Sequence, residues 1–427
     1  MTVLFTTLCR RLFENNPLEA TMSLMAGVLF AVHPVHVDAA GSIVGAAELL
    51  AAFFSLVAMH AYIRCCQKSR DGVLMRAFCI LGALLGITLS TLSKEQGFMV
   101  FALLPIYELL LWSNSSTHPA HAVVRLIPMT LGGIALLRLR FEVMDNKMPH
   151  FTPYTNPVPS HPVHSHRWVT YLYYNAFHGW LLVWPWKLSP LWNYFAPELR
   201  IITTITDPRN LSSMGAFFSM FVIMIYAFSI PGKEIACTTF LCFSLLSFLP
   251  STNLVFNVGF QVAERVLFMP SMGFCAIVSS IVGDFVLLSA LFRRSKSAAS
   301  RTWRMVCKFL LPVAFALLLS TMAAKTHEQA GFWQSAEQLW EATTKSNPFH
   351  GIALANVGQW HDRQGDGNTA HDYYQRAVTA MKTLSEKMVD VERAAAYECI
   401  AATNVLIGEL APFTIWPSLY SELQRTN

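Results

Sequence analysis

Charged residues are scarce in this sequence. Lys, Arg, Asp and Glu together make up 13% of the 427 residues, whereas soluble globular domains carry about 25%. Apolar residues account for 54% of the chain, and the mean hydropathy is +0.41. So little charge excludes a chain that is soluble throughout, and the composition predicts a polytopic membrane protein.

Cysteine is also sparse, and its positions point to no metal. The nine cysteines are scattered along the chain, most of them in or beside apolar runs. A structural zinc site needs pairs of ligands at short, regular spacing, and no cysteines here have that arrangement. We therefore expect neither a zinc site nor a disulfide framework.

Long apolar runs recur along the first three quarters of the chain and stop after Lys325. A helix needs about 17–25 apolar residues to cross ~30 Å of hydrocarbon. Runs of this kind occupy residues 18–33, 43–63, 76–93, 96–112, 122–137, 213–231, 235–251, 266–291 and 306–323. A further stretch, 171–186, is rich in Tyr and Trp and contains Pro185, so we interpret it as a re-entrant or interfacial segment.

Positive charges between the runs predict the orientation, because Lys and Arg in short loops stay on the cytoplasmic side. Three basic clusters stand out: Arg10 with Arg11, residues 64–76 and residues 293–308. If all three are cytoplasmic, several polar segments face the lumen. These segments are residues 33–48, 94–95, 253–265 and 326–427. The basic residues form no lumenal patch, so we expect no nucleic-acid partner.

Residues 326–427 have the amphipathic pattern of soluble helices, unlike the membrane region 1–325. Three positions recur one 34-residue period later, which is the tetratricopeptide period. The matched pairs are Ala336 with Ala370, Trp340 with Tyr374 and Thr343 with Ala377. We interpret 326–427 as an incomplete set of tetratricopeptide repeats in which Gly358 and Tyr374 lie where paired helices touch. An ordinary helical hairpin is the alternative.

Ionisable residues interrupt the apolar stretch 29–54, "LFAVHPVHVDAAGSIVGAAELLAAFF". They are His33, His36, Asp38 and Glu48. Such a group at bilayer depth costs at least ~2.5 kcal/mol and usually faces a cavity or carries function. Pro34 predicts a helix end that places the histidines at the lumenal mouth. These residues either serve a reaction, or the histidines cap the helix end and Glu48 pairs with an arginine.

More polar residues fall on the same predicted side. They are Lys94 and Glu95 between two runs, Arg138 and Arg140 before the loop 141–170, and Glu264 and Arg265 at the start of another run. Such a surface suits a reaction on a lipid-linked phosphate. The cations would hold the departing phosphate, and a carboxylate or imidazole would take a proton from an acceptor hydroxyl. Purely structural salt bridges among these groups are the alternative.

Five motifs, in this order and before the repeats, resemble the transmembrane and tetratricopeptide-repeat O-mannosyltransferases. They are "HPVHVDAAGSIVGAAELLAA", "LSKEQG", "YTNPVPS" with "RWVTYLYYNAFHGWLLVWPWKLSPLW", "DPRNL" and "FLPSTNLVFNVGFQVAERVLFMPSMGFC". Each motif alone is weak, but the ordered set is specific. The resemblance runs from about residue 18 to about residue 380.

The resemblance implies an all-α fold, with a membrane bundle of the GT-C type followed by lumenal repeats, in the endoplasmic reticulum membrane. Members of the family transfer mannose from dolichyl-phosphate mannose to Ser or Thr of cadherin-type extracellular domains, which are β-rich proteins. The lipid-linked donor is a substrate, and neither a cofactor nor a metal is expected. The family also carries a first span and an acidic lumenal loop before the region where this chain begins, and we expect both to be missing here.

The expected site follows from the residues and the resemblance together. Candidates for proton transfer are Asp38, Glu48, His33 and His36, with Asp38 or Glu48 replacing the missing acidic loop. Candidates for holding the donor phosphate are Lys94, Arg265, Arg138 and Arg140, supported by Glu95 and Glu264. A non-catalytic membrane scaffold whose repeats bind a protein partner is the second hypothesis. A transporter is a distant third, because no inverted repeat of broken helices is apparent.

Overall fold

The computed structural model describes the chain except residues 15, 68–71, 115, 117, 148–150, 154, 194, 230–231, 292–308, 387 and 408–427. The described part is helical, and its β pairing is limited to one bridge between Trp192 and Val262. The predicted all-α fold is therefore confirmed. The basic cluster 293–308 and the end of the predicted repeats lie outside the described residues.

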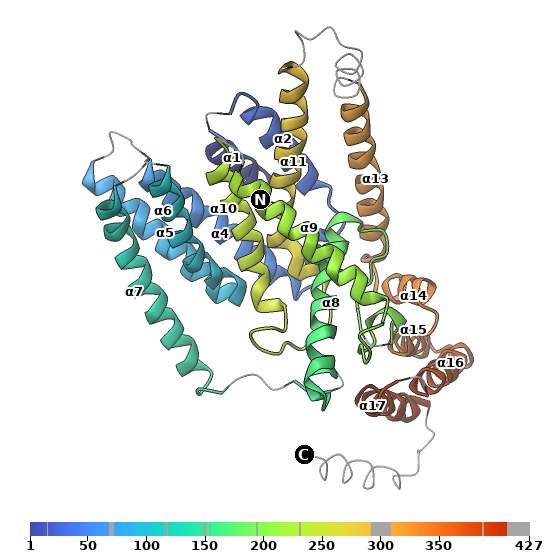
Figure 1. The fold of residues 1–427 in the computed structure, drawn as a ribbon. Coiled ribbons are helices and arrows are strands. Elements are labelled where there is room, and N and C mark those ends of the chain that lie inside the picture. Colours follow the sequence, from blue (N-terminus) through green and yellow to red (C-terminus); the bar gives the residue numbers. More distant parts are fainter. Residues whose placement is uncertain are drawn as a thin grey trace.

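Figure 1 shows a bundle of apolar helices with a smaller group of helices attached at one end. The bundle and its neighbours comprise α1 (Thr2–Leu12), α2 (Glu19–Ala31), α3 (His36–Gly41), α4 (Gly45–Cys66), α5 (Val73–Ser93), α6 (Met99–Ser113), α7 (Pro119–Val143), α8 (His164–Val183), α9 (Arg209–Ser229), α10 (Glu234–Phe248), α11 (Phe268–Leu291) and α13 (Leu311–Phe332). The attached group comprises α14 (Ala336–Ser346), α15 (Gly351–Arg363), α16 (Gly367–Ser385) and α17 (Asp390–Ile407). Short 3-10 turns, η1 (Glu95–Phe98) and η5 (Glu264–Leu267), precede α6 and α11.

Seven described segments are long and apolar enough to cross a membrane. They are Gly45–Cys66, Val73–Ser93, Glu95–Ser113, Pro119–Val143, Arg209–Ser229, Glu234–Ser251 and Glu264–Leu287. At a rise of about 1.5 Å per residue, each reaches roughly the thickness of the hydrocarbon layer. The segments coincide with the seven runs predicted between residues 43 and 291, as expected of a polytopic bundle.

Three other apolar runs behave differently. The run 18–33 forms only the 13-residue helix α2, which is too short for a full crossing. The chain then breaks at Pro34, because proline has no N–H and disfavours helix in the residue before it. Helix α8, which contains most of the run 171–186, is not among these seven segments, and its re-entrant or interfacial position stays a prediction. The run 306–323 begins outside the described residues, and α13 does not reach the apolarity of the other seven.

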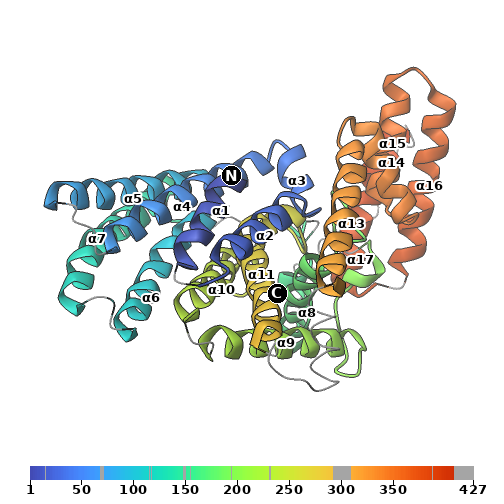
Figure 2. The ribbon, with the colours of Figure 1, turned by 90° about the horizontal axis from the view of Figure 1, so that it is seen from above.

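Small residues allow the membrane helices to approach each other closely. A Cβ atom on Gly273 of α11 would lie 2.2 Å from the backbone oxygen of Phe240 on α10. A Cβ on Gly86 of α5 would lie 3.1 Å from the backbone oxygen of Phe54 on α4. Helices in lipid gain no hydrophobic energy by associating, so contact of this kind contributes much of their packing. Figure 2 shows α4 to α7 together on the side of the bundle away from α14 to α17.

The helices α14 to α17 pack one upon the next along the chain. A Cβ on Gly358 would lie 2.8 Å from two ring carbons of Tyr374, so the aromatic ring does fill the space left by the glycine. Gly365 has a φ of +82° at the turn between α15 and α16, a conformation that glycine adopts without strain. This packing agrees with the contact expected at residue 358. The assignment of these helices as tetratricopeptide repeats stays a prediction.

The connection between α8 and α9, residues 184–208, holds the attached helices to the bundle. Phe195 is fully buried in an apolar cluster formed otherwise by residues of α15, α16 and α17 and by Met388 between the last two. Nε2 of His350 lies 3.2 Å from the backbone oxygen of Leu191. The N–H of Ile201 donates to Oε1 of Glu392 at 2.6 Å. The connection therefore packs against α15, α16 and α17, which follow it much later in the sequence.

Replacing Phe195 by Ala should loosen this attachment. Truncating a buried phenylalanine costs about 3–5 kcal/mol, and most of that contact is made with α15 to α17. We expect faster limited proteolysis after residue 325 in detergent-purified protein, with unchanged protection of the bundle. Phe228→Ala is the matched control, because Phe228 is 55% exposed on α9. Equal cleavage in the two variants would contradict the packing described.

Glu392 gives the attachment a pH dependence. Burial raises the pKa of Glu392 to about 7, against the smaller opposing effects of its hydrogen bonds and of Arg200 and Arg209. An exposed glutamate loses its proton near 4.5, so between pH 4.5 and about 7 the folded protein holds one proton that the unfolded chain releases. The contribution of Glu392 to stability is therefore full below pH 4.5 and falls as the pH rises to about 7.

The Glu392→Gln variant should not lose stability at this position as the pH rises from 4.5 to about 7. The neutral amide keeps an oxygen for the Ile201 N–H, so α17 in the variant should gain resistance to proteolysis over the native protein as the pH rises from 4.5 to 7. Comparing the two proteins isolates Glu392, because His350, whose pKa burial lowers to about 4, is present in both. A ratio of cleavage rates that does not change with pH would refute the assignment.

Candidate functional site

Four short segments meet at the end of the bundle where Lys94 lies. They are α3, the first turn of α4, η1 and η5; helix α4 contacts each of the other three, and α3 also contacts η5. Each follows or precedes a long helix, so its polar residues stand at helix ends, where side chains from different helices can face each other. Asp38, Glu48, Lys94 and Arg265 come together here, and we call these four residues the charge cluster.

Asp38 and Arg265 form one half of the charge cluster. The backbone N–H of Arg265 donates to Oδ2 of Asp38 at 3.0 Å, and the guanidinium Nη1 lies 3.7 Å from the same oxygen. Asp38 is only 2% exposed, and burial raises its pKa although Arg265 opposes the effect. The second oxygen, Oδ1, is buried and has no hydrogen-bond partner in the described part of the protein. One buried carboxylate oxygen of Asp38 is therefore without a described partner.

Glu48 and Lys94 form the other half. Nζ of Lys94, the residue directly after α5, donates to Oε1 of Glu48 in the first turn of α4. Glu48 is fully buried, and its second oxygen, Oε2, has no partner among the described residues. Buried polar atoms in folded proteins are almost always paired. An unpaired oxygen on each of two neighbouring carboxylates is therefore a mark of a binding site.

Glu264 has a different environment from its neighbour Arg265. Its Oε1 accepts hydrogen bonds from the backbone N–H of Ser189 at 2.6 Å and from Nε1 of Trp192 at 2.8 Å. Both donors belong to the connection 184–208. Glu264 therefore fixes that connection against the start of α11, which agrees with a supporting role.

The two histidines are occupied by internal contacts. Nε2 of the fully buried His33 lies 2.9 Å from the backbone oxygen of Leu182, and its Nδ1 accepts the Val35 N–H at 3.4 Å. Nε2 of His36 lies 2.8 Å from Oγ of Ser271, and burial holds its pKa well below the ordinary value. A neutral imidazole with both nitrogens in use is a poor proton acceptor. The geometry favours a structural role for these histidines over the catalytic one, but their contacts join the turn between α2 and α3 and the start of α3 to α8 and α11 and do not cap the helix end.

Helix α7 carries two arginines predicted to hold the donor phosphate, Arg138 and Arg140, and they have different surroundings. Nη2 of Arg140 lies 3.9 Å from Oε2 of Glu95, and both side chains are more than a third exposed. Arg140 therefore borders the charge cluster through η1. Arg138 is exposed and forms no ion pair with any described residue. The structure does not bring Arg138 into the charge cluster.

The sequence analysis does not predict two buried glutamines, Gln96 and Gln261, as site residues. Nε2 of Gln96 lies 3.1 Å from Oγ of Ser251 and 3.4 Å from the backbone oxygen of Val266, while its Oε1 has no described partner. Both side-chain polar atoms of Gln261 are buried and unpaired within the described chain. Each glutamine stands inside a motif quoted above, "LSKEQG" and "NVGFQVAER". An uncharged amide gives a weaker sequence signal than a charged residue, although burying an amide without a hydrogen-bond partner also costs free energy.

A cavity of about 240 Å³ opens near the same end of the bundle. It lies between α8, through Arg167, Trp168 and Tyr171, and the loop 253–257. Its aromatic and amide lining offers flat apolar faces and hydrogen-bonding groups together. Among the described residues, no three His, Cys, Asp or Glu side chains are grouped to hold a metal ion.

Comparison with known proteins identifies the family. Residues 145–222, which contain α8 and the connection 184–208, match the family described as Protein O-mannosyl-transferase TMTC, DUF1736. Over 399 residues the chain is 30% identical to Protein O-mannosyl-transferase TMTC3 of Mus musculus, covering 88% of this chain and 40% of the relative. The chain belongs to the TMTC family.

Two further relatives agree with this placement. Protein O-mannosyl-transferase TMTC4 of Homo sapiens is 29% identical over 82% of this chain and 48% of its own length. Protein O-mannosyl-transferase TMTC1 of Homo sapiens is 30% identical over 88% of this chain and 43% of its own length. The chain thus spans less than half the length of these TMTC relatives. No solved structure matches it.

Proposed function

We propose that this TMTC chain carries the membrane region of a protein O-mannosyltransferase of the endoplasmic reticulum. In this proposal it transfers mannose from dolichyl-phosphate mannose to Ser or Thr of proteins in the lumen, where α14 to α17 also lie. The names of its relatives, protein O-mannosyl-transferases, support a mannosyl transfer to protein. The lipid-linked donor and the β-rich, cadherin-type acceptors rest on the resemblance of the motifs.

The observation that carries the proposal is the half-paired state of the charge cluster. Asp38 and Glu48 each place one oxygen on a cation and leave the other without a described partner. Lys94 and Arg265 bring two positive charges to the same place. A reaction that moves a proton to a carboxylate and negative charge to a phosphate needs both kinds of group within one site.

The reaction balances as an inverting displacement. The acceptor hydroxyl oxygen forms a bond to the anomeric carbon, and the bond from that carbon to the phosphate oxygen breaks, with its electron pair staying on the phosphate. The hydroxyl proton goes to a carboxylate, for which we assign Asp38, because burial raises its pKa and so makes it a stronger base than an exposed aspartate. The departing dolichyl phosphate gains one negative charge, which Lys94 and Arg265 are placed to offset.

Replacing Asp38 by Asn should abolish most of the transfer. The amide keeps the shape of the side chain but accepts no proton, and loss of a general base typically costs about 10²–10⁴-fold in rate. The measurement is mannose transfer from dolichyl-phosphate mannose in microsomes, at matched protein abundance. Glu341→Gln is the control, since Glu341 is a partly exposed residue of α14 paired with Lys345. Unchanged transfer by the Asp38 variant would remove that residue from the mechanism.

Replacing Lys94 or Arg265 by Met should raise the KM for the lipid donor. Methionine keeps an unbranched apolar side chain but loses the charge that holds the phosphate, and a charge-assisted hydrogen bond contributes about 1.5–3 kcal/mol. We therefore expect roughly a tenfold or larger rise in the donor KM. Arg376→Met, on the exposed surface of α16, is the matched control. Lower protein abundance with an unchanged KM would instead favour structural salt bridges.

A further inference from the structure

A second polar cavity lies at the opposite end of the membrane helices from the charge cluster. It has a volume of about 550 Å³, and α4, α5, α6 and α7 contribute to its wall. Helix α4 begins near Glu48 and ends at Cys66 on the cavity, 18 residues or about 27 Å further along. Helix α5 runs the other way, from Arg76 on the cavity to its end beside Lys94. The charge cluster and this cavity are therefore at opposite ends of the membrane helices.

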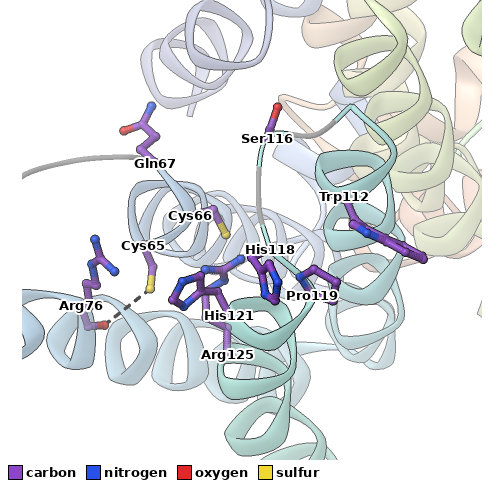
Figure 3. Close-up of a pocket in the computed structure, with 10 residues that line it drawn as sticks. All are labelled: Cys65, Cys66, Gln67, Arg76, Trp112, Ser116, His118, Pro119, His121 and Arg125. Atoms are coloured by element: carbon purple, nitrogen blue, oxygen red, sulfur yellow. Dashed lines mark hydrogen bonds between the residues drawn. The ribbon is translucent and has the colours of Figure 1, made fainter.

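The described lining of this cavity is cationic and contains no carboxylate. Figure 3 shows Arg76, His118, His121 and Arg125 around it, with Trp112 beside them. Arg76 comes from the first turn of α5, and the other three basic residues come from the N-terminal part of α7. Basic side chains from two helices thus share one concave surface.

Arg125 is held rigidly in the cavity wall. Its Nε and Nη2 donate to the two oxygens of Glu108, each at 2.7 Å. Glu108 is 2% exposed and also accepts the hydroxyl of Tyr62 at 2.8 Å. The carboxylate that balances Arg125 is therefore behind the wall and does not line the cavity. A bidentate pair of this kind fixes the plane of the guanidinium group.

His118 adds a hydrogen-bond donor, its ring atom Nε2. The N–H of Ala120 donates to Nδ1 of His118 at 3.3 Å. A neutral imidazole that accepts at one nitrogen carries its proton on the other, so Nε2 of His118 is an N–H donor. The ring of His121 lies 6.3 Å from the ring of His118. The cavity therefore gathers several hydrogen-bond donors on one concave surface, and no carboxylate is among its described lining residues.

The position of the cavity indicates what could reach it. Trp112 is 54% exposed, and tryptophan is enriched where membrane helices meet the headgroup layer. The cavity lies at the ends of helices long enough to cross the bilayer. The anions concentrated at this depth are the phosphate groups of lipids.

We propose that this cavity binds a phosphate group, carried by an anionic membrane lipid. Arg76 and Arg125 supply the positive charge, the two histidines supply further donors, and Trp112 packs against the glycerol or acyl part of the lipid. The site does not depend on the mannosyl transfer proposed above, since it lies on the other face of the bundle. A soluble phosphate compound would satisfy the same donors, so the experiment must separate the two sources.

The test uses the full chain in nanodiscs. Thermal stability is measured in phosphatidylcholine alone, in phosphatidylcholine with a minor fraction of phosphatidate, and in phosphatidylcholine with inorganic phosphate in the buffer. We expect phosphatidate to raise the Tm and to remain bound in native mass spectrometry. An equal rise with inorganic phosphate alone would support the cavity but assign it to a soluble ligand. No rise with either probe would overturn the proposal.

Substitutions in the lining test whether phosphatidate binds in this cavity. Arg76→Gln combined with His121→Gln should weaken phosphatidate binding roughly tenfold or more, because charge-assisted hydrogen bonds are lost. Arg10→Gln is the matched control, since Arg10 is 59% exposed, pairs with Glu19 and does not line the cavity. Gln67→Glu tests the same point while keeping all four basic residues, because it adds a carboxylate to an exposed position of the lining. Wild-type binding in both Gln67→Glu and the double variant would refute the site.

Discussion

The cost of burying a charge in a low-dielectric bundle constrains the rest of this structure. An unpaired ion at such depth is strongly unfavourable, so buried charges must find opposite charges or several donors. Among the described residues, four ion pairs meet this requirement by joining different segments of the chain. They are Asp38 with Arg265, Glu48 with Lys94, Glu108 with Arg125, and Asp284 with Lys233. Each pair therefore fixes the relative position of two helices as well as neutralising a charge.

The pairs differ in how completely they are satisfied, and the difference separates structure from candidate function. Both oxygens of Glu108 accept from Arg125. Asp284 accepts from Lys233 at 2.5 Å on one oxygen and from the Tyr226 hydroxyl at 2.6 Å on the other. Asp38 and Glu48 instead each leave one buried oxygen unpaired among the described residues. A salt bridge that served only to hold helices together would gain nothing from an orphaned oxygen, which costs about 1–3 kcal/mol.

Local sequence predicted much of the fold but few of the partners. Apolar length located the seven spanning segments, and Pro34 located the break before α3, because both depend on properties of short stretches. The pairing of Asp38 with Arg265 joins residues 227 positions apart, and only the packing of α3 against η5 decides it. Charge alone also failed to distinguish Arg138 from Arg140, which share a helix but differ in whether Glu95 is within reach. Buried amides such as Gln96 carry no charge and left no comparable signal.

The boundary between the two regions shows the same contrast between composition and packing. Composition changes at Lys325, yet the connection 184–208 is attached on both sides of that division. Towards the bundle, Ser189 and Trp192 donate two hydrogen bonds to Glu264, worth together about 3–6 kcal/mol if each contributes 1.5–3. Towards α15 to α17, Phe195 is buried, worth about 1.5–3 kcal/mol, and Ile201 donates to Glu392 with a bond of similar value. The two attachments are therefore of comparable strength, and neither region alone holds the connection. Glu264 directly precedes Arg265, so a continuous series of contacts joins the charge cluster, through the connection 184–208, to the helices that follow the membrane region.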